Sequence, residues 1–224
     1  MRIRKAFPVP LQRCGLTSRS LIALMIVAGL LLSCTASQPE NGPVYRSEHG
    51  FTIALPSQWL AVNQLEIGSK ENPIGTDNPR IRNLFTAEGI KALKEKARSG
   101  GIELFVNLET SDETFIESIN VQAARGSIVV DQSDVVPACA ETEKRLTTLY
   151  GKPVTMSACK ILKIQRMPAV FMEYQVERLA LAHVQYLIQL KTDRYVVMTL
   201  TCRPQSLSKL RPEFDAIVAS FRAT

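Results

Sequence analysis

The most regular pattern of apolar and polar residues lies in the last third of the chain. Apolar side chains recur at about every second position in four consecutive stretches, which are separated by short breaks. A period of two is typical of strands with a buried face, and short connections require antiparallel neighbours. The pattern therefore predicts a four-strand meander over residues 156–166, 169–178, 182–191 and 195–202.

Shorter strand patterns precede this meander. Apolar residues in 102–108 alternate with Glu103 and Asn107, which predicts a half-buried strand with these two side chains in its polar row. Trp59, the only tryptophan, follows an apolar stretch and a Pro-containing turn, so we expect a core anchor whose N–H finds a local acceptor. The further strands are expected at 44–47 and 51–55, around a turn at His49 and Gly50, and at 115–123, antiparallel to 102–108.

Three segments have helical signals. Thr86 and Gly100 bracket one helix as N-cap and C-terminal stop, and Gly151 ends a second that begins near Asp134. The second helix is expected to bury Cys139, Thr142, Leu146 and Leu149 on one face. An apolar stripe from Leu207 to Phe221 predicts the third, which Pro212 should bend or restart. Helices on a largely antiparallel sheet define the α+β class.

The N-terminal residues have the pattern of an export signal. A basic run leads into the apolar segment 21–32, which is too short to span a bilayer, and Ser33 and Cys34 follow. The residues Leu31, Leu32, Ser33 and Cys34 resemble the lipobox of bacterial lipoproteins. This resemblance implies cleavage before Cys34 and lipid attachment to it, and Thr35, in place of an Asp, implies an outer membrane where the organism has one. The domain organisation expected is a signal peptide over 1–33, a lipidated Cys34 and flexible tether over 34–43, and one α+β domain over 44–224.

Removal of the signal changes the charge of the chain. The full sequence has a formal net charge of +6 with 27 Lys and Arg. Five of these basic residues lie in 1–33, so 22 remain against 21 Asp and Glu. The mature protein is therefore close to neutral, and we expect no nucleic-acid partner.

Three cysteines remain in the exported domain: Cys139, Cys159 and Cys202. Cys139 lies early on its helix, and the strand after Gly151 returns far enough along that helix for Cys159 to meet it. A disulfide between Cys139 and Cys159 is the expected pair, while a bridge from either cysteine to Cys202, or no bridge, remains open. Cys202 lies in an apolar row and is expected to be a buried thiol if it stays free.

The sequence contains no motif for a catalytic nucleophile, a phosphate loop or a zinc site, so we expect no catalytic residues, cofactor or metal. His49 falls in a turn, and His183 is expected on the polar face of a strand. Glu173 belongs to a set of glutamates that are expected on exposed faces. An alternative function, a small-ligand binder or hydrolase, would use a site between the polar loop 66–83 and the sheet.

Three stretches of the exported domain resemble the PsbP-like fold: GFTIALPSQW, FIESINV and YVVMTLTCRPQSLSKLRPEFDAIVASFR. The resemblance implies an α/β/α sandwich with an antiparallel sheet, used by known members to dock onto larger assemblies without catalysis. The leading hypothesis is thus a lipid-anchored envelope protein that faces the periplasm or exterior and serves as a non-enzymatic accessory or docking factor. Its partners would be the membrane, through the lipid, and a membrane-associated protein assembly.

Overall fold

A computed structural model describes residues 42–62, 95, 101–112, 114–128 and 131–224. Cys34, the 66–83 loop and, apart from Glu95, the helix expected at 86–99 lie outside the described residues. The strands are β1 (Val44–Arg46), β2 (Phe51–Ala54), β3 (Trp59–Ala61), β4 (Ile102–Asn107), β5 (Ser118–Arg125), β6 (Val154–Ile164), β7 (Met167–Val176), β8 (Leu181–Lys191), β9 (Arg194–Cys202) and β10 (Arg222–Ala223). The helices are α3 (Gln132–Tyr150), α4 (Leu207–Ala219) and the short 3₁₀ turns η2 (Glu177–Leu179) and η3 (Pro204–Ser206).

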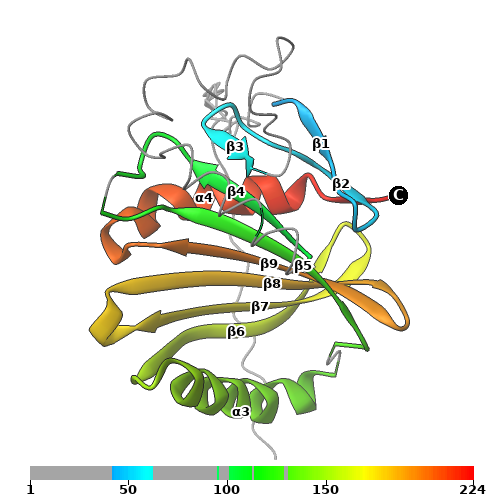
Figure 1. The fold of residues 1–224 in the computed structure, drawn as a ribbon. Coiled ribbons are helices and arrows are strands. Elements are labelled where there is room, and N and C mark those ends of the chain that lie inside the picture. Colours follow the sequence, from blue (N-terminus) through cyan, green and yellow to red (C-terminus); the bar gives the residue numbers. More distant parts are fainter. Residues whose placement is uncertain (1–41, 63–94, 96–100, 113, 129–130) are drawn as a thin grey trace, which may run out of the picture. The chain divides into compact units, whose positions relative to one another are not determined.

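The larger sheet has the strand order β3-β4-β5-β9-β8-β7-β6, and every neighbouring pair is antiparallel. Strands β6 to β9 are consecutive in both sequence and space, so the meander and the α+β class are confirmed (Figure 1). A smaller sheet with the order β1-β2-β10 pairs the first strand hairpin with the C-terminal strand.

Helices cover both faces of the larger sheet. On one face, α4 inserts Leu210, Phe214 and Ile217 into the main core, where Phe171 and Ile188 of the sheet meet them. On the other face, α3 packs along β6 and covers separate apolar clusters. The two helices therefore cover opposite faces of the sheet, which is the layering expected of an α/β/α sandwich (Figure 1).

Helix α3 ends as expected but buries a different side chain in its last turn. Gly151 adopts a left-handed conformation with φ of 61°, and its N–H bonds the carbonyl of Thr148 at 3.3 Å. The prediction that Leu149 is buried is wrong, because this side chain is 77 % exposed. Tyr150 packs against the sheet in its place and contacts His183.

Strand β4 is covered on both faces, so it is not half-buried. Phe105 belongs to the main core, while Val106 packs in a second cluster with Leu60 and Val62. Glu103 and Asn107, expected in a polar row, are 3 % and 0 % exposed. The row of Glu103 and Phe105 is covered by the β1–β2 hairpin, where Ser47 donates a hydrogen bond to Glu103 and Tyr45 packs edge-on against Phe105.

Candidate functional site

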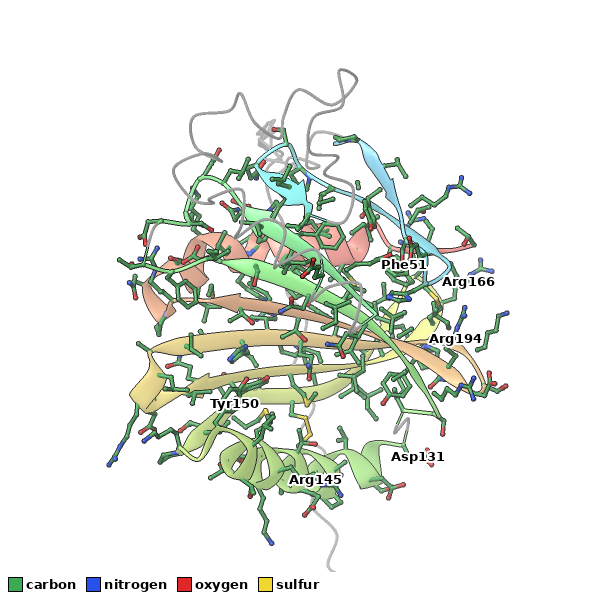
Figure 2. The ribbon with its side chains drawn as sticks, in the orientation of Figure 1. Phe51, Asp131, Arg145, Tyr150, Arg166 and Arg194 are labelled. Atoms are coloured by element: carbon green, nitrogen blue, oxygen red, sulfur yellow. A yellow bond between two sulfur atoms is a disulfide. The ribbon has the colours of Figure 1, made fainter. Side chains whose placement is uncertain are left out.

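A disulfide joins Cys139 of α3 to Cys159 of β6, which is the pair favoured by the sequence (Figure 2). The two Cα atoms are 6.2 Å apart, within the usual range for a disulfide. The bridge ties the helix to an edge strand of the sheet, since among the described strands β6 pairs only with β7. It therefore fixes one helical layer of the sandwich covalently.

A cavity of about 190 Å³ lies beside this disulfide, between α3 and the sheet. Both bridged cysteines line it, and most of the other lining side chains are apolar, among them Val135, Val170 and Met172. The lining residues that carry a hydroxyl group are Ser127, Thr142 and Tyr195. An apolar cavity of this order holds a group about the size of a benzene ring. These side chains suit a site that binds an apolar group and positions no acid or base.

His183 is a buried part of the α3-facing side of the sheet, so the prediction of a polar strand face is wrong. Its side chain is 4 % exposed, and its ring stacks on Tyr174 with centroids 4.8 Å apart. Nδ1 lies 3.1 Å from Thr201 Oγ1, and Nε2 lies 3.4 Å from the hydroxyl of Tyr150. Burial lowers the pKa of His183 to about 4. The imidazole is thus neutral near pH 7 and enclosed by aromatic rings.

Trp59 is the expected core anchor, but its acceptor is distant in sequence. The indole is 3 % exposed, and Nε1 donates a 3.1 Å hydrogen bond to Oε2 of Glu213 on α4. Gln58 donates to the same oxygen. One carboxylate of the last helix therefore holds the start of β3.

Two buried glutamates were not anticipated. Glu103 accepts hydrogen bonds from Ser47 Oγ at 3.0 Å and from the backbone N–H of Glu48 at 2.8 Å, which stabilises the β1–β2 hairpin. Glu117 is 0 % exposed, and its Oε1 lies 3.5 Å from Nε of Arg203. Both carboxylates hold loops and strand ends in place. Phe105, a large aromatic residue in the row of Glu103, was the available signal that this row faces the core.

Two further predictions concern a thiol and a carboxylate. Cys202 is a buried free thiol, as expected, and burial raises its pKa to about 12. The Glu173 side chain is only 23 % exposed, so the expectation of an exposed carboxylate is wrong; it forms an ion pair with Arg211 of α4 and accepts a hydrogen bond from Ser157 Oγ at 3.1 Å. Within residues 42–62, 101–112, 114–128 and 131–224, no group of three His, Cys, Asp or Glu side chains is arranged to hold a metal ion. In the same ranges, no helix has both the length and the apolar character of a membrane span.

Comparison with known proteins identifies the fold. No family model matches the sequence. The structure of cyanobacterial PsbP (CyanoP) from Synechocystis sp. PCC 6803 aligns over 88 % of this chain and 100 % of its own, with a TM-score of 0.50 and 11 % identity. The chain therefore has a PsbP-like α+β fold.

Two other similarities are weaker. The Ran-binding protein Mog1p of Saccharomyces cerevisiae aligns over 81 % of this chain and 96 % of its own, with a TM-score of 0.42 and 13 % identity. A glutathione synthetase from Thermosynechococcus vestitus is 30 % identical over 81 residues, which are 36 % of this chain. The aligned part spans only 25 % of that synthetase.

Proposed function

We propose that this chain is a lipid-anchored protein of the cell envelope, where it docks non-enzymatically onto a membrane-associated protein assembly. The Cys139–Cys159 disulfide is the observation that carries the location, because disulfides persist in exported proteins and are rare in a reducing cytosol. The lipobox-like residues that end in Cys34 supply the anchor. A tether of nine residues, 35–43, then leads to β1.

The docking role is supported by the PsbP-like fold and by the short tether. The resemblance of the sequence to PsbP-like proteins implies attachment to larger assemblies, and the structural likeness to CyanoP agrees with that family. A tether of nine residues keeps a domain within about 30 Å of its lipid, at ~3.3 Å per residue. A partner in the same membrane would then be at a high effective concentration.

The anchor is tested by a Cys34→Ala variant that is expressed beside the wild type. The wild-type chain should lose residues 1–33, carry acyl groups on Cys34 by mass spectrometry, and stay with membranes through a salt wash. The variant should lack the acyl groups and no longer be trimmed before residue 34. If Cys34→Ala were trimmed at the same place and fractionated with membranes like the wild type, the proposed anchor would be wrong.

The docking role is tested by cross-linking in cells followed by affinity capture of the lipidated chain. We expect one membrane-associated assembly to be enriched with wild type and lost with Cys34→Ala. Cross-links should connect that assembly to the α+β domain. Cross-links that are distributed among unrelated envelope proteins in proportion to their abundance would contradict a specific docking role.

The cavity beside the disulfide favours a second candidate, the binding of a small apolar ligand. Toluene is a suitable probe, since it matches the size and character of the lining. Saturating toluene should raise the melting temperature of the wild type, and Ala138→Phe, whose ring would occupy the cavity, should remove the shift. An equal shift in both proteins would exclude this cavity as the site. The alternative of a site at the 66–83 loop concerns residues outside the described ranges.

A further inference from the structure

One end of the domain gathers basic side chains from five segments that are far apart in the sequence. We call it the basic end. It lies where the β1–β2, β6–β7 and β8–β9 turns meet the C-terminal strand, and Figure 2 shows Arg166 and Arg194 on the same side of the domain as Phe51. Its members are Arg46, Arg125, Lys163, Arg166, Lys191, Arg194 and Arg222.

Three of these residues form a row across three neighbouring strands. Arg125 of β5 lies directly opposite Arg194 of β9, and Arg194 lies directly opposite Lys191 of β8. Directly opposed residues of antiparallel strands project from the same face, so three positive charges are adjacent. Like charges in this arrangement destabilise a sheet, and an anion bound across them would relieve the repulsion.

The smaller sheet adds a second group. Arg46 of β1 and Arg222 of β10 both lie opposite Thr52 of β2, and both are exposed. The two groups meet at the β1–β2 hairpin, where a Cβ at Gly50 would lie only 3.2 Å from Nη2 of Arg194. Arg194 therefore links the row on the larger sheet to the smaller sheet.

The β6–β7 turn joins the same end through a shared acceptor. Gln165 Nε2 donates to the carbonyl of Ala219 at 2.8 Å, and Arg222 Nη1 donates to the same oxygen at 3.2 Å. Arg166 follows Gln165 in the turn, and Lys163 lies two residues before Gln165. Both basic side chains are exposed.

The carboxylates at this end do not neutralise it. Glu48 and Asp193 are exposed in the two hairpin turns, and Glu103 is buried beneath the first of them. No member of the basic end forms an ion pair with a carboxylate of the described residues, in which the paired cations are Arg145, Arg203, Lys209 and Arg211. The near-neutral mature chain therefore has a local excess of positive charge.

We infer that the basic end binds the phosphate headgroups of an anionic lipid surface, an inference that rests on the proposed function. The position of the tether favours lipid over other polyanions, because β1 begins ten residues after Cys34 and Arg46 is the third residue of β1. An acyl group at Cys34 thus holds the basic end within reach of the bilayer. Val44 shares the outward face of β1 with Arg46 and is 71 % exposed, and an apolar side chain among basic ones suits the boundary between headgroups and acyl chains.

The test uses the chain from residue 34 with Cys34→Ser, so that no acyl group contributes to binding. This form should fold, because all the described core lies in the compact unit Ser37–Thr224. Co-sedimentation is measured with vesicles of phosphatidylcholine alone and with vesicles that also contain phosphatidylglycerol. We expect binding only to the anionic vesicles, and its loss as salt rises from about 0.15 to about 1 M, since the Debye length falls from about 8 to about 3 Å.

A triple variant Arg46→Gln, Arg166→Gln, Lys191→Gln removes three exposed members that make no side-chain hydrogen bond in the described residues. Each basic side chain near an anionic surface contributes roughly fivefold in partitioning, so the triple variant should bind roughly a hundredfold less. The matched control is Lys144→Gln, Lys152→Gln, Arg178→Gln, which removes the same charge from α3 and from the opposite end of the meander. The control should bind like the parent, and urea unfolding should show that both triple variants are folded.

Two results would overturn the inference: no preference of the parent for anionic vesicles, or an equal loss of binding in the two triple variants. Acylation of Cys34 is measured separately on the intact chain. If Cys34 is acylated but the lipid-free form does not bind anionic vesicles, the inferred role of the basic end is wrong and the proposed anchor still holds. A chain that binds anionic vesicles through the basic end but is never acylated supports this surface and contradicts the anchor.

Discussion

Trp59 on β3 donates a 3.1 Å hydrogen bond through Nε1 to Oε2 of Glu213 on α4, across 154 positions of sequence. The bond connects the edge of the larger sheet to the helix that covers its main core. Gln58 donates to the same oxygen at 3.1 Å. A single carboxylate therefore satisfies two donors next to a buried indole.

Replacement of Glu213 by Ala should lower the free energy of unfolding by about 1 to 3 kcal/mol, because it leaves the buried indole N–H without its acceptor. Glu213→Gln retains an acceptor oxygen, so it should lower the free energy of unfolding much less. Urea unfolding checks both variants, with the fluorescence of this single tryptophan and the far-ultraviolet circular dichroism as probes. Glu141→Ala, on the exposed face of α3, is the matched control and should leave stability nearly unchanged. Equal losses in Glu213→Ala and Glu141→Ala would contradict the role of the bond.

Removal of the Cys139–Cys159 bridge should destabilise the domain by about 3 kcal/mol, since the bridge closes a loop with a sequence separation of 20. The measurement is urea unfolding of Cys139→Ala/Cys159→Ala with and without dithiothreitol. Reductant should bring the wild type to the stability of the double variant and leave the double variant unchanged. Cys202→Ala is the control and should keep the response to reductant, because Cys202 is a free thiol. If reductant did not change the stability of the wild type, the bridge would not contribute to the free energy of unfolding.

The sequence predicted the meander and its neighbours because their period of two is a local property. Residues that are buried by contacts from distant segments could not be placed in this way. His183 alternates like an exposed strand residue, but Tyr150, 33 positions earlier, covers it. The polar row of β4 gave the same error, since Glu103 is covered by Ser47 and Glu48 of the β1–β2 hairpin, more than 50 positions earlier.

The candidate sites show the same division. The Cys139–Cys159 pair could be favoured from helix rise and strand length alone, since both cysteines flank one turn at Gly151. The basic end could not be predicted, because its members come from positions as distant as Arg46 and Arg222. Only the strand register, with Thr52 between those two residues, brings them together.

The buried histidine predicts a specific acid sensitivity. The pKa of His183 is about 4 in the folded protein against 6.5 as the reference value, so the unfolded chain binds more protons between these pH values. Stability that is fully present above pH 6.5 should therefore fall as the pH is lowered towards 4. The expected loss from this group is about 3 kcal/mol, at 1.36 kcal/mol per pKa unit.

The measurement is the free energy of unfolding at several pH values between 4 and 6.5 for the wild type and His183→Gln. The variant should be less stable near neutral pH, because it disturbs the packing against Tyr174, but its stability should depend less on pH over this window. A slope in His183→Gln as steep as that of the wild type would assign the acid sensitivity to other groups.

The ion pair between Glu117 and Arg203 joins two side chains of unequal burial. Glu117 is 0 % exposed and Arg203 is 23 % exposed, so loss of the arginine leaves a buried carboxylate without its cation. Arg203→Met should therefore lower the free energy of unfolding by about 2 to 4 kcal/mol, near the lower end of the range for breaking a buried pair. Asp112→Asn removes only the exposed partner of the same arginine, which bonds Nη1 at 2.7 Å, and should cost much less.

A double-mutant cycle separates the pair from the packing of each side chain. Glu117→Gln in the Arg203→Met background should recover part of the lost stability, because a neutral amide is less costly to bury than an unpaired carboxylate. The cycle is measured by urea unfolding above pH 6, so that the carboxylate of the unfolded chain is ionised. If the two substitutions instead added without recovery, the buried charge would not be the cause of the loss, and the packing of Arg203 over the Phe115 ring, 5.6 Å from its centroid, would account for it.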